Sequence, residues 1–306
     1  MMGRGQASQS AGRMRRLAAQ AGLGLAALLA SIPTWAQEGA QAAAPPPHQG
    51  WFNPDRINLF LVLIVFLALI LWFVQQAKQG KSLFIRRIAA LDAIEESVGR
   101  ATEMGKSVLY VPGIDDATNI QTIYSMVILN SVAKMVAQYD TPLVVPIAKS
   151  FVVPLAEETV RAGYLDAGRP EAFQPDNIRY LSDEQFAFTA AVNGIMLRDK
   201  PATNLFLGSF FAESLVLAET GFSTGAVQIA GTANVHQLPF FVVACDYTMI
   251  GEEFFASSAY LSREPMLVGT LKGTDAMKLI LFALLVLGTI LETAGVTGFK
   301  AWFDVR

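Results

Sequence analysis

The chain has 306 residues, of which 53% are hydrophobic and only 16% are charged, and its formal net charge is −3. A charged fraction this far below the ~25% of ordinary soluble domains excludes a typical soluble composition and indicates membrane segments. The single cysteine, Cys245, excludes an internal disulfide, and together with only two histidines it excludes a His/Cys zinc site.

The first 36 residues have the pattern of a secretory signal peptide. Arg13, Arg15 and Arg16 precede a small-residue apolar stretch, and residues 34–36 (TWA) resemble a cleavage site. An uncleaved signal anchor is the alternative, and it gives the same topology. Residues 37–56 follow as an external linker rich in Ala and Pro.

Two long apolar segments bracket the middle of the chain. The first, residues 57–76, contains an apolar run from Ile57 to Val74. In the second, residues 277–298, Glu292 is the only charged residue after Lys278. An apolar helix of 18 residues is about 27 Å long, close to the ~30 Å hydrocarbon core of a bilayer. Both segments are therefore predicted to span a membrane, with residues 299–306 as a short external tail.

Basic residues next to both predicted spans lie on the side of the central region. They are Lys78, Lys81, Arg86, Arg87, Arg263, Lys272 and Lys278. By the positive-inside rule, the central domain is expected in the cytoplasm and both mature termini outside, in a bacterial inner (plasma) membrane. Residues 77–275 carry 15 Lys and Arg against 22 Asp and Glu, a net charge of −7. This acidic balance argues against nucleic-acid binding and leaves the lipid bilayer as the predicted partner.

Residues 77–106 follow the first span and are predicted to form a juxtamembrane amphipathic helix. Ile88, Leu91, Ile94 and Val98 recur at steps of three and four residues, with charged residues on the other face. Such a helix packs on its own domain, lies on the membrane or pairs with a second copy.

Residues 107–273 alternate short β-rich runs with helical stretches. The predicted strands are Ser107–Val111, Leu143–Pro146, Ile178–Leu181, Asn204–Gly208, Ala226–Ala230 and Phe240–Cys245, with a seventh short run at Met266–Leu271. The predicted helices are Ile120–Gln138, Val153–Ala167, Asp183–Leu197 and Phe211–Glu219. Apolar strands separated by helices predict an α/β fold, with a mostly parallel sheet and flanking helices inserted between the two transmembrane helices.

Ligands of open α/β sheets bind beyond the carboxyl ends of the strands, so polar residues there are candidate site residues. They are Asp115, Asp116, Asp183, Glu213, His236 and Asp246. Converging carboxylates suit a hard cation such as Mg²⁺, and the metal candidates are Asp115, Asp116 and Asp246. The competing interpretation is that these carboxylates cap the helices that follow the strands.

Signatures of common enzyme classes are missing from the sequence. It contains no G-x-G-x-x-G dinucleotide motif and no phosphate-binding P-loop, and the Gly-rich stretch Gly221–Gly225 lies before a predicted strand, at the wrong end for the usual phosphate cradle. His236 is interpreted as a structural residue rather than a base, and Cys245 as an inert buried thiol. The sequence leaves the cofactor unknown, and it leaves catalysis open while favouring a protein that is not an enzyme.

Two further features indicate contacts between helices. Glu252, Phe255 and Ala259 share one helical face, which suits a contact either within the chain or between subunits. Glu292 lies inside the second span, where a carboxylate faces protein or water, unless it is near enough to the outer interface to be solvated.

Three stretches of the chain carry a family resemblance: Ser107–Asp116, Phe210–Gly231 and Gln237–Pro265. Together they resemble an uncharacterised family of prokaryotic membrane proteins, a domain of unknown function with a cytoplasmic α/β domain and a C-terminal transmembrane helix. The resemblance covers most of Arg86 to Glu292. It implies one unit of domain plus span, and no activity, cofactor or site residue.

The predicted function is a membrane-tethered cytoplasmic binding or assembly domain, a homo-oligomeric scaffold of unknown ligand. One alternative is a membrane-bound, Mg-dependent enzyme acting on a small, phosphorylated or unphosphorylated, metabolite. Another is an accessory subunit of a transporter, because two spans are too few for most self-contained transporters but suffice to join other membrane proteins.

Overall fold

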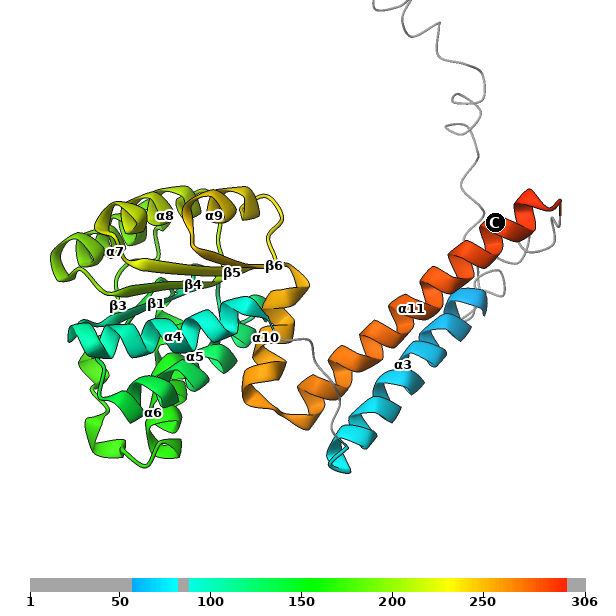
Figure 1. Cartoon of the computed structure of the whole chain (residues 1–306), viewed down its shortest axis with the longest axis horizontal. Coiled ribbons are helices and arrows are strands. Elements are labelled where there is room, and N and C mark those ends of the chain that lie inside the picture. The colour runs from blue at the N-terminus through cyan, green and yellow to red at the C-terminus, as the bar shows by residue number, and fades with distance from the viewer. Residues whose placement is uncertain (1–56, 82–87, 296–306) are drawn as a thin grey trace, which may run out of the picture. The chain divides into compact units, whose positions relative to one another are not determined.

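The computed structural model describes residues 57–81 and 88–295. The predicted signal peptide (1–36), the linker (37–56) and the tail (299–306) lie outside the described residues. Element labels follow Figure 1. The helices are α3 (Ile57–Lys78), α4 (Ala89–Met104), α5 (Ile120–Tyr139), α6 (Val153–Asp166), α7 (Gln185–Asp199), α8 (Glu213–Thr224), α9 (Leu238–Ala244), α10 (Glu252–Ser262) and α11 (Pro265–Thr293). The strands are β1 (Val108–Gly113), β2 (Leu143–Ile147), β3 (Ile178–Tyr180), β4 (Thr203–Ser209), β5 (Val227–Thr232) and β6 (Tyr247–Ile250).

The six strands form one parallel sheet in the order β3-β2-β1-β4-β5-β6. This is the order of the doubly wound α/β folds. The chain first moves outward from β1 to β3, then returns to the centre and moves outward in the other direction through β4, β5 and β6. The predicted α/β fold with a parallel sheet is therefore confirmed.

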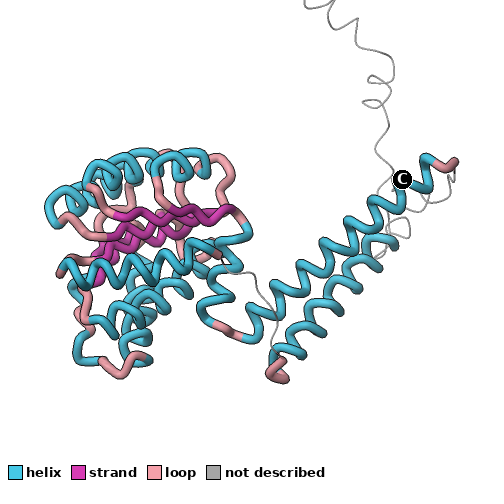
Figure 2. The backbone as a smooth tube through the Cα atoms, in the orientation of Figure 1, coloured by secondary structure: helices cyan, strands magenta, loops and turns pink. Residues whose placement is uncertain are grey.

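Helices cover both faces of the sheet, as Figures 1 and 2 show. Side chains of α4, α5 and α6, with Phe254 of α10, form one hydrophobic core with inward residues of the strands. Side chains of α7, α8 and α9 form the second core on the opposite face. Because both faces are covered, the central strands are apolar throughout instead of alternating between apolar and polar residues.

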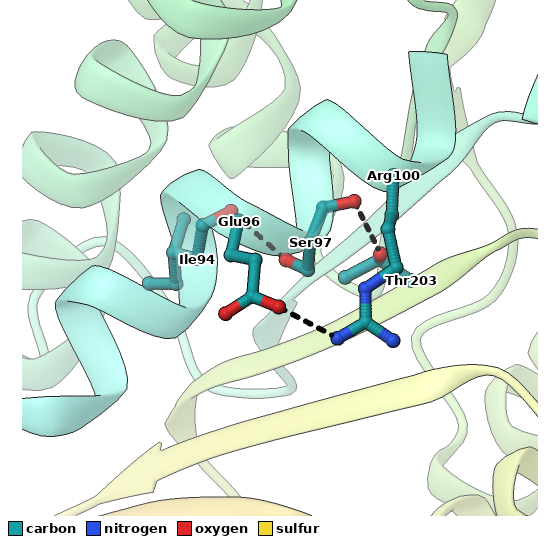
Figure 3. Close-up of polar contacts among 5 residues, drawn as sticks. All are labelled: Ile94, Glu96, Ser97, Arg100 and Thr203. Atoms are coloured by element: carbon teal, nitrogen blue, oxygen red, sulfur yellow. Dashed lines mark hydrogen bonds and ion pairs between the residues drawn. The ribbon is translucent and has the colours of Figure 1, made fainter. Parts of the chain in front are cut away.

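The helix that follows α3, α4, packs on the α/β domain. The face of α4 that includes Ile94 and Val98 is fully buried on the sheet. Figure 3 shows the polar contacts of this helix. Ser97 Oγ donates to the Ile94 carbonyl within α4 (2.9 Å), and Thr203 Oγ1 of β4 donates to the Ser97 carbonyl (3.2 Å). On the exposed side, Arg100 and Glu96 form an ion pair of 3.0 Å.

The sequence prediction was wrong at the last strand. Residues 240–245 were predicted as a strand, but they belong to α9 and its C-cap, and β6 begins later, at Tyr247. A strand that pairs in parallel with β5 must be separated from it by a crossover of roughly a dozen residues. The residues between β5 and β6, which include α9, form this crossover. Pro239 in the first turn also favours a helix start, so the crossover requirement outweighs the β-propensity of the FFVVAC run.

The short run Met266–Leu271 was also misassigned as a strand, since it forms the first turns of α11. Within the second predicted span, 277–298, residues 277–293 form the later part of a helix of 29 residues that ends at Thr293. Gly295 follows with a φ of +86°, a left-handed conformation that glycine adopts readily after a helix end.

Three helices in the described part of the chain are long and apolar enough to cross a membrane: α3, α5 and α11. Of the most apolar 18 residues, 56% are buried in α5, against 0% in α3 and 6% in α11. The helix α5 is accordingly a core helix of the α/β domain. The apolar surfaces of α3 and α11 remain exposed and are compatible with membrane association.

Close packing joins α11 to α3 through two glycines spaced G-x-x-x-G. A Cβ on Gly269 would lie 2.7 Å from the backbone nitrogen of Val74, and one on Gly273 would lie 2.8 Å from Cα of Ile70. The contacts run in opposite chain directions, so the two helices are antiparallel. Small residues at this spacing let helix backbones approach closely in membranes.

Candidate functional site

The strand order reverses between β1 and β4, and doubly wound proteins bind ligands in the crevice beyond the carboxyl ends of such a strand pair. In this protein the loop 114–119 leaves β1 and the loop 210–212 leaves β4 at that point. These two loops, with the loop after β5, define the carboxyl edge as the candidate site.

The carboxyl ends of β1 and β4 are held together by close backbone contact. Pairing shifts by one residue after Val111, and it resumes at Gly113 opposite Ser209. The N–H of Ile114 then donates to the Ser209 carbonyl at 3.0 Å. Gly113 has a φ of +96°, and a Cβ there would lie 2.7 Å from the backbone nitrogen of Ser209. Glycine is required here because a side chain would collide with the backbone of β4.

Two amide side chains, the buried Gln121 and the half-buried Asn234, connect the loops at the same edge. Gln121, in the first turn of α5, donates from Nε2 to Asn234 Oδ1 (2.9 Å) and accepts from the N–H of Ala233 (2.8 Å). Asn234 Nδ2 in turn donates to the Phe210 carbonyl (2.7 Å) and to Ser209 Oγ (3.1 Å). We call this network the Gln121–Asn234 bridge. It ties the loops after β4 and β5 to the start of α5.

The carboxylate of Glu213 is fully buried at the start of α8. It accepts hydrogen bonds from the N–H of Phe211 (2.8 Å) and from Gln185 Nε2 at the start of α7. Both partners are protein groups, so Glu213 fastens the loop after β4 to the neighbouring helix.

The remaining carboxylates of the edge bond to nearby groups of their own loops. Asp115 Oδ2 accepts from Asn119 Nδ2 (2.7 Å), and Asp116 Oδ1 accepts from the N–H of Ala117 (2.6 Å). The side chain of Asn119, and not an aspartate, caps α5 by accepting from the N–H of Gln121 (2.8 Å). Asp183 is exposed and contributes its backbone carbonyl as an acceptor for Lys149 Nζ (3.1 Å).

The cap of α7 is Glu184, one residue after the predicted Asp183. Its carboxylate accepts from the N–H groups of Phe186 (3.1 Å) and Ala187 (2.5 Å), and these bonds hold its pKa below the usual 4.5. A lowered pKa in the folded state means that the cap stabilises the fold above pH 4.5 and that this stabilisation is lost as the pH falls through the folded pKa.

We therefore expect Glu184→Ala to lower the thermal unfolding temperature at pH 7, with a difference from the unmodified protein that disappears toward pH 3. Calorimetry across this pH range checks the expectation. Glu95→Ala, which removes an exposed carboxylate in the middle of α4, serves as the control and is expected to change little at either pH. A deficit for Glu184→Ala that persists unchanged at pH 3 would contradict the capping role.

The predicted cation site is not assembled. Asp246 precedes β6, so it lies at the amino edge of the sheet, where its Oδ2 accepts from the N–H of Gln228 at 2.8 Å. Asp115 and Asp116 lie at the opposite, carboxyl edge. His236 is exposed in the loop between β5 and α9. Within residues 57–81 and 88–295, no group of three His, Cys, Asp or Glu side chains is placed to hold a metal. The misplacement of Asp246 follows directly from the misassigned last strand.

An exposed apolar surface lies on the outer side of α8 and α9. We call it the α8–α9 face and define it as Leu215, Phe222, Phe240, Val242 and Val243. Val243 is 87% exposed and Phe222 is 72% exposed, while neighbouring Phe241 points inward and stacks on Phe206. A surface helix normally carries polar residues on its outer side, and α9 (LPFFVVA) has none.

Taken together, these features define a doubly wound α/β protein whose switch point is closed by its own backbone and amide side chains, joined to a pair of apolar helices. The chain belongs to the family described as Domain of unknown function (DUF6754), whose model matches residues 47–303. The predicted resemblance to an uncharacterised family is confirmed, and the match includes α3 as well as the α/β domain and α11. Comparison with curated proteins and with solved structures finds no significant match in either.

Proposed function

We propose that this protein is a membrane-tethered assembly module. In this proposal α3 and α11 anchor it in the bilayer, the α/β domain lies in the cytoplasm, and copies of the domain associate through the α8–α9 face. The observation that carries the proposal is the apolar outer side of α9, because a helix that is apolar all round is typically covered on both sides.

The state of the carboxyl edge favours assembly over catalysis. Gly113 brings the backbones of β1 and β4 together, and the Gln121–Asn234 bridge and Glu213 use protein groups as their partners. The groups that a small-molecule site would offer to a ligand are thus engaged in fixing the loops. The α8–α9 face, in contrast, consists of exposed apolar side chains.

The membrane orientation rests on the charges beside the two apolar helices. Lys78 ends α3, and Lys272 and Lys278 precede the exposed apolar part of α11. Positive residues at these ends favour a cytoplasmic location of the α/β domain at a bacterial inner membrane. The apolar exteriors of α3 and α11 supply the anchor.

A second copy of the chain is the partner that fits the α8–α9 face. The domain carries a net charge of −7 over residues 77–275, so identical copies repel one another over most of their surface. The five residues of the α8–α9 face are uncharged, so contact there brings few like charges together, the exposed Glu219 between Leu215 and Phe222 being one of them. Tethering at both ends confines the copies to the membrane and raises their effective concentration for contact.

Light scattering of the full-length protein in mild detergent tests the proposal. We expect a dimer or larger oligomer, and Val243→Glu should weaken it at least about a hundredfold because it buries an unpaired charge in the contact. Leu165→Glu, at an exposed leucine of α6 on the other side of the sheet, is the matched control and should leave the oligomer intact. A monomeric unmodified protein, or equal disruption by the control, would remove the basis of the proposal.

A further inference from the structure

Three loops at the carboxyl edge of the sheet each present an exposed phenylalanine. Phe151 follows β2, Phe186 lies in the first turn of α7 after β3, and Phe211 follows β4. These side chains are 82%, 59% and 44% exposed. We call the three of them the phenylalanine edge. A single exposed apolar residue is common on a protein surface, whereas a group of large ones marks an interaction site.

Hydrogen bonds join the three loops to one another. Lys149 Nζ, in the loop after β2, donates to the carbonyl of Asp183 in the loop after β3 (3.1 Å). Gln185, at the start of α7, donates to the buried carboxylate of Glu213, which also accepts from the N–H of Phe211 (2.8 Å). A partner therefore meets loops whose backbone is already ordered, and this lowers the entropic cost of binding.

The charges beside the phenylalanine edge are mainly negative. In the loops that follow β1, β2, β3 and β4, four exposed or half-buried carboxylates stand against one basic side chain, Lys149; the carboxylates are those of Asp115, Asp116, Asp183 and Glu184. The edge thus combines large apolar side chains with a negative electrostatic potential, and a partner has to match both properties.

The negative potential disfavours two partners that the apolar side chains alone would suit. The cytoplasmic leaflet of a bacterial membrane is anionic and repels carboxylates. A second copy of the chain in a two-fold contact would place the same carboxylates opposite one another, and like charges across an interface suppress binding. A protein surface with lysine or arginine around apolar hollows is complementary to both properties of the edge.

We propose that the phenylalanine edge is the docking surface for a different protein, one whose contact surface has apolar pockets for Phe151, Phe186 and Phe211 with lysine or arginine beside them. Aromatic side chains are enriched at the centres of protein interfaces. The basic residues of the partner pair with exposed carboxylates such as Asp183 at the rim, where charge complementarity selects the partner and speeds its approach. The phenylalanine edge shares no residue with the α8–α9 face, so docking here does not require association of copies through that face.

Photocrosslinking in living cells of the native host identifies what contacts this edge. The photoreactive amino acid p-benzoylphenylalanine replaces Phe186 of the full-length protein in one strain and Phe222 in a second strain. Phe222 is the matched control, because it is a phenylalanine of comparable exposure (72%) on the α8–α9 face. After irradiation, mass spectrometry identifies each adduct and the linked segment.

The two positions are expected to give different adducts. Crosslinking from Phe186 should yield a different protein, linked at a segment of net positive charge, at least about fivefold more than crosslinking from Phe222 does. Crosslinking from Phe222 should instead link two copies of the chain, and its failure to do so would count against the α8–α9 face alone. From Phe186, an adduct of two copies, an adduct with lipid, a linked segment of negative charge or no adduct would each overturn the proposed docking surface.

The need for a basic partner is tested at two exposed carboxylates in the Phe186 crosslinking strain. Asp183→Asn removes a charge beside the phenylalanine edge, and Glu219→Gln removes one from α8 as the control. We expect Asp183→Asn to lower the yield of the adduct at least about threefold and Glu219→Gln to leave it unchanged. An equal yield from both variants would overturn the assignment of a basic partner.

Discussion

Replacing Gly113 by alanine is expected to cost about 3 kcal/mol or more of folding stability. The residue has a φ of +96°, where an L side chain pays roughly 1–2 kcal/mol. Its Cβ would also meet the backbone of Ser209, which has no flexible end that can move aside, and overpacking of this kind costs a further ~1–3 kcal/mol. Chemical denaturation of the full-length protein in detergent measures the loss.

Gly168→Ala separates these two contributions. Gly168 follows α6 with a φ of +73°, and its Cβ would meet no heavy atom within 4 Å. This variant should pay the backbone strain alone, roughly 1–2 kcal/mol. If Gly113→Ala costs no more than Gly168→Ala, the close contact between Gly113 and the backbone of β4 is absent.

Replacing Gly273 by alanine is expected to destabilise the contact between α11 and α3 by about 1–3 kcal/mol. The new methyl group would lie 2.8 Å from Cα of Ile70, so the helices must separate along the G-x-x-x-G contact. Alanine has a higher helix propensity than glycine, so a loss of stability would come from the contact with α3 and not from the helix itself. Thermal unfolding in detergent provides the measurement.

Gly194→Ala is the matched control for the helix contact. Gly194 lies in the exposed side of α7, and its Cβ would have open space. With no neighbour to displace, alanine should raise stability by about 0.4–1 kcal/mol. The two glycine variants are therefore expected to shift the unfolding temperature in opposite directions. A stabilising Gly273→Ala would show that α3 and α11 are not packed at this position.

The sequence predicted the parallel sheet because hydrophobic pattern and crossover length agree at most of its elements. The runs at 107–111 and 143–146 are apolar, short and followed by long helical stretches, and they lie in β1 and β2. Agreement failed at Phe240, where the local preference for a strand conflicts with the need for a crossover before β6. The topology of the sheet determines which preference prevails, and the pattern of a single sequence does not contain that topology.

The candidate site was less predictable than the fold. Local chemistry identified the edge, but the interpretation of its aspartates as helix caps was wrong for Asp115 and Asp116, which bond within their own loop while Asn119 caps α5. The Gln121–Asn234 bridge joins residues 113 positions apart, and it forms only because β4 and β5 follow β1 in the sheet. The G-x-x-x-G spacing at Gly269 was readable, but the strand assigned to 266–271 concealed it.

Cysteine crosslinking in intact cells tests the central claim most directly, since it reports both association and orientation. Burial and the charge of Asp246 raise the pKa of Cys245 to about 12, so the native thiol is unreactive at neutral pH, and Cys245→Ser removes it altogether. In that background, single cysteines replace Phe222, Phe240 or Val243 on the α8–α9 face, and Leu165→Cys serves as the control. A membrane-permeant bismaleimide should yield covalent dimers from the face positions and none from the control, while an impermeant reagent should yield none. Dimers from the control alone, or dimers formed by the impermeant reagent, would contradict a cytoplasmic domain that assembles through this face.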